Sequence, residues 1–165
     1  MTGHATPTSL TAFLPVTGDP VRLAGVMAED PQGWLPDGAS DGPDQRRLTI
    51  HCESGLHTVS VRISQPWWAG NTLWRTVSWD ALDGFEETHG GCAELSAVDG
   101  ELGLHASPGA VSLILDVRYT PSSGRSDVSA LHREARSTAE RLLADIAAGL
   151  TRAADVVEVP AVASR

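Results

Sequence analysis

The feature that most constrains the fold of this chain is a long amphipathic segment near its C-terminus. Between residues 126 and 150, apolar side chains recur every three or four residues, which places them on one face of an α-helix. A long helix with one apolar face has to be covered by another layer, which the rest of the chain is expected to supply. Successive members of the stripe are 3, 4, 4, 3, 4 and 4 residues apart: Val128, Leu131, Ala135, Ala139, Leu142, Ile146 and Leu150.

The preceding residues contain short segments in which apolar and polar residues alternate, as in β-strands that are buried on one face. Asp19 and Pro20 predict the N-cap and first residue of a short helix. Residues 31–45, which are rich in glycine, proline and aspartate, predict an irregular connection, and Asp99–Gly100 predicts a tight turn. The alternating segments predict seven strands, at residues 9–16, 46–52, 57–64, 72–80, 92–98, 101–106 and 110–120.

These elements predict an α+β fold, in which a seven-stranded antiparallel sheet wraps around the long C-terminal helix. A chain of 165 residues is accounted for by one domain with a substantial core. We assign residues 1–8 to a flexible leader, residues 9–150 to this domain and residues 151–165 to a C-terminal tail. Gly149 is expected to weaken the helix close to its end.

The tryptophans of the chain are concentrated in one stretch. Four of the five lie between residues 66 and 79, in a chain with two phenylalanines and one tyrosine. Trp67 and Trp68 lie between a proline and a glycine, which predicts a loop; there they either gate a ligand cavity or plug the end of the core. Trp74 and Trp79 differ in parity, so a strand over residues 72–80 sends Trp79 inward and Trp74 outward.

The same register turns Arg75 toward the inside of the sheet, together with Leu73 and Val77. A guanidinium in that position needs a partner for its charge and its N–H groups. Three roles are open for it: binding an acidic group of a ligand, forming an internal ion pair, or reaching water from the edge of the strand.

Composition and charge exclude several classes of function. The formal charge of −9 argues against binding to nucleic acid, and no apolar run approaches the roughly 20 residues of a membrane span. The N-terminus lacks the pattern of a signal peptide, which predicts a cytoplasmic protein. Cys52 and Cys92 fit no zinc spacing and the six histidines form no metal motif, so neither metal nor cofactor is predicted.

Known catalytic motifs are also missing. The chain contains neither a GxSxG nucleophile motif nor a phosphate-binding GxxxxGK[ST] loop. Any histidine could serve as a general base. His51 and His105 are predicted to face solvent, however, and His132 to flank the apolar stripe of the helix.

Three stretches resemble the START-like helix-grip superfamily, and specifically its bacterial polyketide cyclase and dehydratase-like members. "GDPVRLAGVMAEDPQGWLP" resembles their first helix, "PWWAGNTLWRTVSW" the loop and strand at the cavity mouth, and "YTPSSGRSDVSALHREARSTAERLLADIAAGL" the last strand and closing helix. The match runs from about residue 9 to residue 150. It implies the helix-grip fold, which hosts binding, transport, cyclisation and hydrolysis, and no catalytic arrangement carries over residue by residue.

The first functional hypothesis is that the protein binds a small hydrophobic or aromatic molecule in a cavity between sheet and helix. The alternatives are a cyclase or dehydratase acting on a polyketide-like metabolite, mainly by orienting it, and a protein-interaction module that uses its exposed tryptophans. The small residues in the middle of the helix stripe leave room for such a cavity. The candidate ligand-binding residues are Trp67, Trp68, Arg75, Trp79, Leu115, Tyr119, Ala135 and Ala139.

Overall fold

A computed structural model describes residues 8–52, 55–80, 98–119 and 128–163 of the chain. Its helices are α1 (Pro20–Met27), the short 3₁₀ helix η1 (Pro31–Gly33) and α3 (Val128–Ala163). Its strands are β1 (Thr8–Val16), β2 (Asp37–Gly42), β3 (Gln45–Cys52), β4 (Gly55–Ile63), β5 (Trp67–Ala69), β6 (Thr72–Asp80), β7 (Val98–Ser107) and β8 (Ala110–Tyr119).

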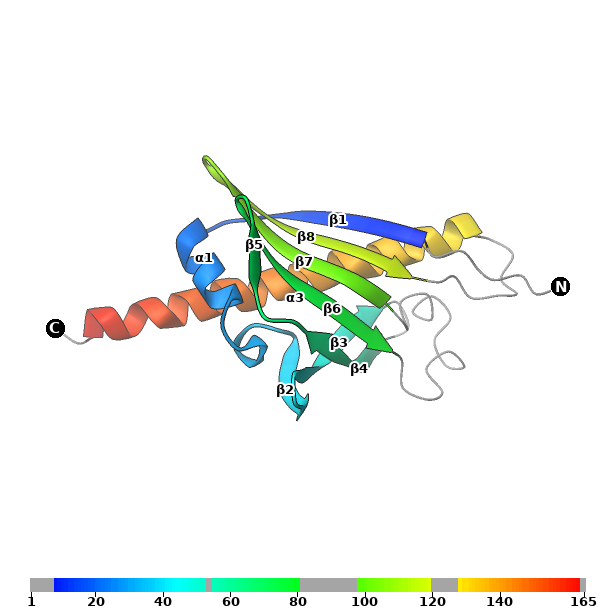
Figure 1. The fold of residues 1–165 in the computed structure, drawn as a ribbon, viewed down its shortest axis with the longest axis horizontal. Coiled ribbons are helices and arrows are strands. Elements are labelled where there is room, and N and C mark those ends of the chain that lie inside the picture. Colours follow the sequence, from blue (N-terminus) through cyan, green and yellow to red (C-terminus); the bar gives the residue numbers. More distant parts are fainter. Residues whose placement is uncertain (1–7, 53–54, 81–97, 120–127, 164–165) are drawn as a thin grey trace.

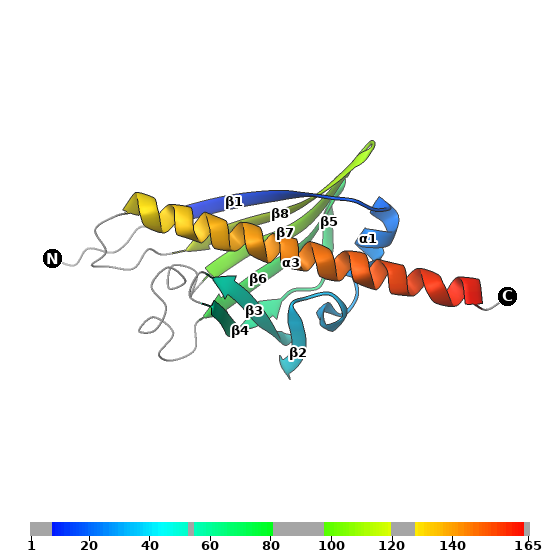
Figure 2. The same ribbon diagram turned by 180° about the vertical axis from the view of Figure 1, so that it is seen from behind.

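The strands form one sheet in the order β1-β8-β7-β6-β4-β3-β2, and β5 pairs with β6 beside this path. All paired strands are antiparallel. The long helix α3 lies across one face of the sheet, behind it in Figure 1 and in front of it in Figure 2. The predicted α+β fold, an antiparallel sheet around a long C-terminal helix, is confirmed, with eight strands among the described residues and not seven.

Two strands lie where the sequence predicted irregular chain. β2 lies within residues 31–45, and its pairing with β3 shifts register twice, which explains why no regular alternation marks it. β5 occupies the predicted tryptophan loop. Three residues paired to one neighbour are too short a segment to show a period.

The tight turn predicted at Asp99–Gly100 is wrong, because β7 runs through both residues. Gly100 serves a different purpose there. A Cβ atom at this position would lie 2.2 Å from the backbone oxygen of Asp116 on β8, so the two strands can approach only where a side chain is missing. Residues 92–97 of the predicted preceding strand lie outside the described part of the chain.

The core lies between the inner face of the sheet and α3. Members of the predicted helix stripe from Ala135 to Leu150 are buried there, opposite the inward residues of β6, β7 and β8. The helix then continues past its predicted end at residue 150, and residues 151–163 are helical. In Figure 1 this end of α3 extends beyond the sheet on the side of α1.

Gly149 lies inside α3 and does not end it. A Cβ atom at this position would lie 2.1 Å from the backbone oxygen of Trp34, which follows η1. The glycine therefore lets the connection between α1 and β2 pack directly on the helix backbone. Trp34 itself is fully buried at this contact.

This contact predicts the effect of Gly149→Ala on stability. Alanine normally stabilises a helix relative to glycine by about 1 kcal/mol, but here the methyl group collides with backbone. We expect the free energy of unfolding, measured by urea denaturation, to fall by about 1–3 kcal/mol. The matched control is Gly25→Ala in α1, where an added Cβ meets nothing within 4 Å. Equal stabilisation by both substitutions would contradict the contact.

Candidate functional site

The register of β6 determines which tryptophans face the core. Leu73, Arg75, Val77 and Trp79 are buried on the inner face, as predicted from the alternation of the sequence. Trp74 is half-buried on the opposite, outer face. The predicted division between an inward Trp79 and an outward Trp74 is therefore confirmed.

The short strand β5 separates the two neighbouring tryptophans that were predicted to share a loop. Trp67 pairs with Trp74 and stacks on it, with ring centroids 6.0 Å apart, so it belongs to the outer face. Trp68 pairs with Leu73 and belongs to the inner face, where it lines a pocket. Consecutive residues of a strand point to opposite sides, so one predicted aromatic pair becomes two separate features.

An apolar pocket of about 340 Å³ lies between α1 and the end of the sheet that carries β5. Trp68 stands at its edge with 60% of its surface exposed, which is unusual for the largest apolar side chain. We call this site the apolar pocket. Its lining residues are Pro20, Val21, Ala24, Gly25, Ala28, Trp68, Asn71, Leu104 and Ala106.

The helix α1, which forms one wall of the apolar pocket, is stabilised by its N-cap and by burial of its side chains. The Asp19 carboxylate accepts a hydrogen bond from the backbone N–H of Arg22 at 3.2 Å, and Pro20 occupies the first turn, as the sequence predicted. A helix of eight residues has little stability of its own. Burial of Leu23 and Met27 holds α1 on the rest of the molecule.

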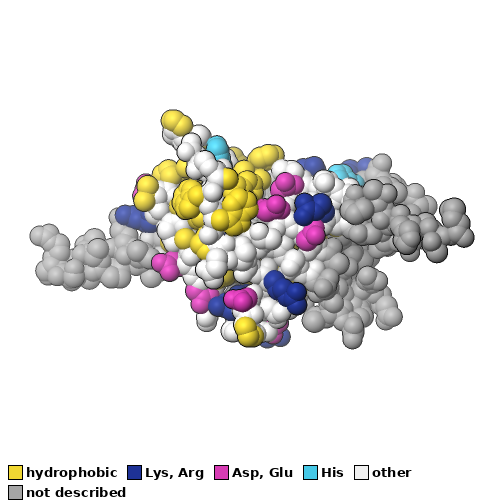
Figure 3. All heavy atoms as spheres, in the orientation of Figure 1, with side chains coloured by type: hydrophobic (Ala, Val, Ile, Leu, Met, Phe, Trp, Pro, Cys, Tyr) yellow, Lys and Arg dark blue, Asp and Glu magenta, His cyan; other side chains and the backbone are white. Residues whose placement is uncertain are grey.

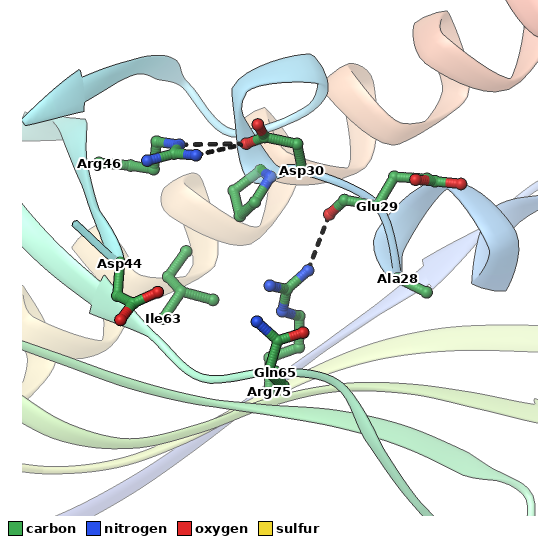
Figure 4. Close-up of a pocket in the computed structure, with 9 residues that line it drawn as sticks. Ala28, Glu29, Asp30, Asp44, Arg46, Ile63, Gln65 and Arg75 are labelled. Atoms are coloured by element: carbon green, nitrogen blue, oxygen red, sulfur yellow. Dashed lines mark hydrogen bonds and ion pairs between the residues drawn. The ribbon is translucent and has the colours of Figure 1, made fainter. Parts of the chain in front are cut away.

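Arg75 fixes the other end of α1. Its side chain is 5% exposed and reaches from β6 to three backbone carbonyls. Nε donates to the oxygen of Ser64 at 3.0 Å, and Nη1 donates to the oxygens of Met27 and Glu29, both at 2.9 Å. Figure 4 shows the bond to Glu29. Met27 is the last residue of α1, and the last carbonyls of a helix lack partners within it and carry negative partial charge, so the guanidinium satisfies this one well. Glu29 follows two residues later.

The predicted inward orientation of Arg75 is thus confirmed, but its observed partners are backbone carbonyls. The guanidinium also lies 5.9 Å from the centre of the Trp34 ring, in the range of a cation–π contact. Burial lowers the pKa of Arg75 from its ordinary value. The side chain connects β6, the end of β4 and the end of α1 through a single group.

A second, polar pocket of about 250 Å³ surrounds Arg75 and shares Ala28 with the apolar pocket. Across it, the Arg46 guanidinium binds one oxygen of Asp30 through Nε at 3.1 Å and Nη2 at 2.9 Å (Figure 4). A hydrogen bond from the backbone N–H of Gln32, together with the one from Arg46, lowers the pKa of Asp30. Asp30 is mostly exposed, so this ion pair adds little stability.

The remaining predicted site residues lie in the core. Ala135 and Ala139 are 0% exposed on α3, and Leu115 and Tyr119 are buried on β8. None of them lines the apolar or the polar pocket. That these residues bound a ligand cavity stays a prediction.

The described histidines form two local pairs with hydroxyl groups. The Tyr119 hydroxyl lies 2.8 Å from Nδ1 of His132, and the two rings stack. The Thr72 hydroxyl lies 2.8 Å from Nδ1 of His105, which is half-buried and not fully solvent-facing, while His51 is exposed as predicted. Among the residues that the structure describes, no three His, Cys, Asp or Glu side chains group as a metal site would require.

Comparison with known proteins gives a match at the level of fold. No protein-family model matches the chain, and no curated protein matches it by sequence. No helix in the described part of the chain is long and apolar enough to cross a membrane.

Three solved structures match most of the chain, each with a TM-score of 0.52. Ara h 8.0201 is 13% identical, with 89% of this chain and 99% of its own covered. A START superfamily protein from Mycobacterium smegmatis is 12% identical, with 87% and 97% covered. The Zhui aromatase/cyclase from Streptomyces sp. R1128 is 13% identical, with 90% and 94% covered. These likenesses show the fold: the chain has a helix-grip fold similar to that of these START-like structures.

Proposed function

We propose that this protein binds a small hydrophobic or aromatic molecule, and that the apolar pocket beneath α1 receives it. The observation that carries the proposal is the exposed indole of Trp68 at the edge of a pocket whose other walls are almost entirely apolar. The volume of about 340 Å³ lies in the range of small-molecule sites. A bound apolar ligand would cover aromatic surface that is otherwise in water.

The lining of the pocket limits the chemistry of the ligand. No charged side chain contributes to it, so an ionised group buried there would have no partner. The Asn71 amide and the Trp68 indole N–H are the polar side-chain groups among the lining residues. They suit a mainly apolar, uncharged molecule with one or two hydrogen-bonding atoms at one end.

The same lining favours binding over catalysis. General acid–base chemistry needs a titratable group within hydrogen-bond reach of the reacting atoms, and none of the lining side chains titrates near neutral pH. The predicted alternative, a cyclase or dehydratase, would have to act by orienting its substrate or use groups elsewhere. Tyr119 with His132 is a hydrogen-bonded pair that could move a proton, but it does not line this pocket.

The cavity predicted around Ala135 and Ala139 remains a second candidate for the location of the ligand. Both positions carry methyl groups in the middle of α3, where larger side chains would fill the same space. A ligand there would have to displace core contacts that cover these residues completely. The open pocket beneath α1 needs no such rearrangement, and we therefore place the ligand there.

The proposal predicts that two adjacent substitutions differ in their effect on ligand binding. N-phenyl-1-naphthylamine, an uncharged aromatic fluorophore, is titrated into the wild-type protein, Trp68→Ala and Trp67→Ala. We expect Trp68→Ala to weaken binding about tenfold or more, because an aromatic wall of the pocket is lost. The melting temperature should change little, since the indole is largely exposed.

Trp67→Ala is the comparison variant, because its ring lies on the outer face and is not part of the pocket lining. Its affinity for the fluorophore should equal that of the wild type. A third variant, Ala139→Leu, tests the interior location. If Ala139→Leu abolishes binding while Trp68→Ala leaves it unchanged, the ligand occupies the core and the pocket assignment is wrong.

A further inference from the structure

The outer face of the sheet carries a continuous apolar row that no other element of the described chain covers. Trp67, Trp74, Gly103, Ile114 and Phe13 are register partners in that order across β5, β6, β7, β8 and β1. Phe13 is 63% and Trp67 42% exposed. Figure 3 shows hydrophobic side chains gathered on this face over β5 and its neighbours.

Gly103 leaves the space that the Trp74 ring occupies on the outer face. A Cβ atom there would lie 2.5 Å from the ring of Trp74, so this ring lies flat over the glycine. Trp67 then stacks on Trp74 with an angle of 25° between the ring planes. The arrangement holds two indole rings in fixed positions on the surface, where a partner can bind them with little loss of side-chain entropy.

A second row, of opposite chemistry, runs beside the first. Glu101 and Asp116 are direct partners across β7 and β8, two residues along each strand from the apolar row. Two carboxylates facing each other on one side of a sheet repel. The adjacent Arg118 is bound to Asp99 at 3.2 Å, and no basic side chain among the described residues pairs with Glu101 or Asp116.

The carboxylates are only partly satisfied by uncharged groups. Thr11 donates to one oxygen of Asp116 at 3.1 Å. One oxygen of Glu101 is buried and has no hydrogen-bond partner among the described residues. A cation placed beside the two carboxylates would relieve their repulsion through the oxygens that remain accessible. Acidic side chains stand beside the apolar cluster in Figure 3.

We propose that this outer face binds a second protein through a segment that combines an arginine with apolar side chains. The guanidinium pairs with Glu101 and Asp116, and the apolar side chains cover Trp67, Trp74 and Phe13. Arginine suits the site because its planar group binds carboxylates in a forked geometry and stacks on indole rings. A second copy of this chain suits it less, because each copy carries a formal charge of −9.

The distance between the two rows specifies the segment further. Residues two apart along a strand are separated by about 7 Å, so the rows are that far apart. An extended segment lying along the strands has the same spacing between every second side chain. The partner segment that fits is therefore extended and has an apolar residue two positions before an arginine, with any residue between them.

The test uses the synthetic peptide Ac-Gly-Leu-Thr-Arg-Thr-Leu-Gly-NH2, which follows this pattern and contains no tryptophan. It is titrated into 15N-labelled protein and followed by NMR. We expect saturable shifts confined to backbone amides of the two rows. The same peptide with glutamate in place of arginine, and the one with serine in place of both leucines, should bind about tenfold more weakly or not at all.

Substitutions in the protein complete the test. Glu101→Gln combined with Asp116→Asn should weaken peptide binding about tenfold, and Asp41→Asn, an exposed carboxylate on β2, should leave it unchanged. Phe13→Ser should also weaken peptide binding, and because Phe13 is exposed, the protein should stay folded. No shift at millimolar peptide, shifts elsewhere, or equal binding of the glutamate peptide overturns the proposal. So does a dimer in sedimentation that Phe13→Ser dissociates, because a second copy would then be the occupant.

Discussion

Replacing Arg75 by methionine is expected to lower the free energy of unfolding by about 3 kcal/mol and to loosen α1 from the sheet. Methionine fills a similar apolar volume but donates no hydrogen bond. The carbonyls of Ser64, Met27 and Glu29 would each lose the donor that the guanidinium supplies. A hydrogen bond from a charged group contributes about 1.5–3 kcal/mol, and leaving a buried carbonyl without a partner costs a comparable amount, although such terms do not add fully.

Urea denaturation measures the global effect, and hydrogen exchange measures the local one. Amides of residues 23–28 should exchange faster in Arg75→Met by more than the global loss explains, because α1 opens while the sheet stays closed. Arg75→Lys separates charge from geometry. Lysine keeps the positive charge, but its ammonium lacks the planar, forked shape with which the guanidinium reaches three carbonyls. It should therefore restore only part of the stability.

Arg46→Met is the matched control for this experiment. It removes an arginine from the same polar pocket, where the partner is the exposed carboxylate of Asp30. Surface ion pairs contribute about 0–1 kcal/mol, so the expected loss is several times smaller. If both variants lose the same stability, Arg75 acts through its charge in the pocket and not through the carbonyls of α1.

The orientation of Arg75 was predictable from the sequence, but its hydrogen-bond partners were not. Alternation along residues 72–80 predicted that Arg75 faces inward with Val77, because a strand allows no other arrangement once one face is buried. Its partners were not predictable in the same way. The carbonyls of Met27 and Glu29 come from a segment more than forty residues away, and every residue carries the same backbone oxygen.

The tryptophan pair shows a different limit. A proline before Trp67 and a glycine after Trp68 are typical of a loop, and local signals favoured that interpretation. The structure places a three-residue strand there, because β6 offers a free edge that only tertiary structure creates. Gly149 is similar: local propensity predicted a weak point near the end of a helix, whereas the contact with Trp34 explains the glycine. Periodic features were predictable, and contacts between distant segments were not.

The second large effect is expected at Trp79, whose inward position followed from parity alone. Trp79→Ala should lower the free energy of unfolding by about 3–5 kcal/mol, as truncation of a buried aromatic side chain does. Its side chain is 5% exposed, in the inner row between Val61 on β4 and Val98 on β7. The cavity left by the indole would lie between β4 and β7, and the close-packed neighbouring side chains can fill it only in part.

Trp74→Ala is the control for this prediction, because it removes the same side chain from the same strand on the opposite face. Trp74 is half-buried over Gly103 and touches Trp67, so its loss should lower the free energy of unfolding by about 1 kcal/mol. Both variants retain tryptophans whose fluorescence reports urea unfolding. Trp79→Phe should recover more than half of the loss, since it refills most of the space. If Trp74→Ala proves the more destabilising of the two, the faces of β6 are reversed, and Arg75 can no longer hold α1.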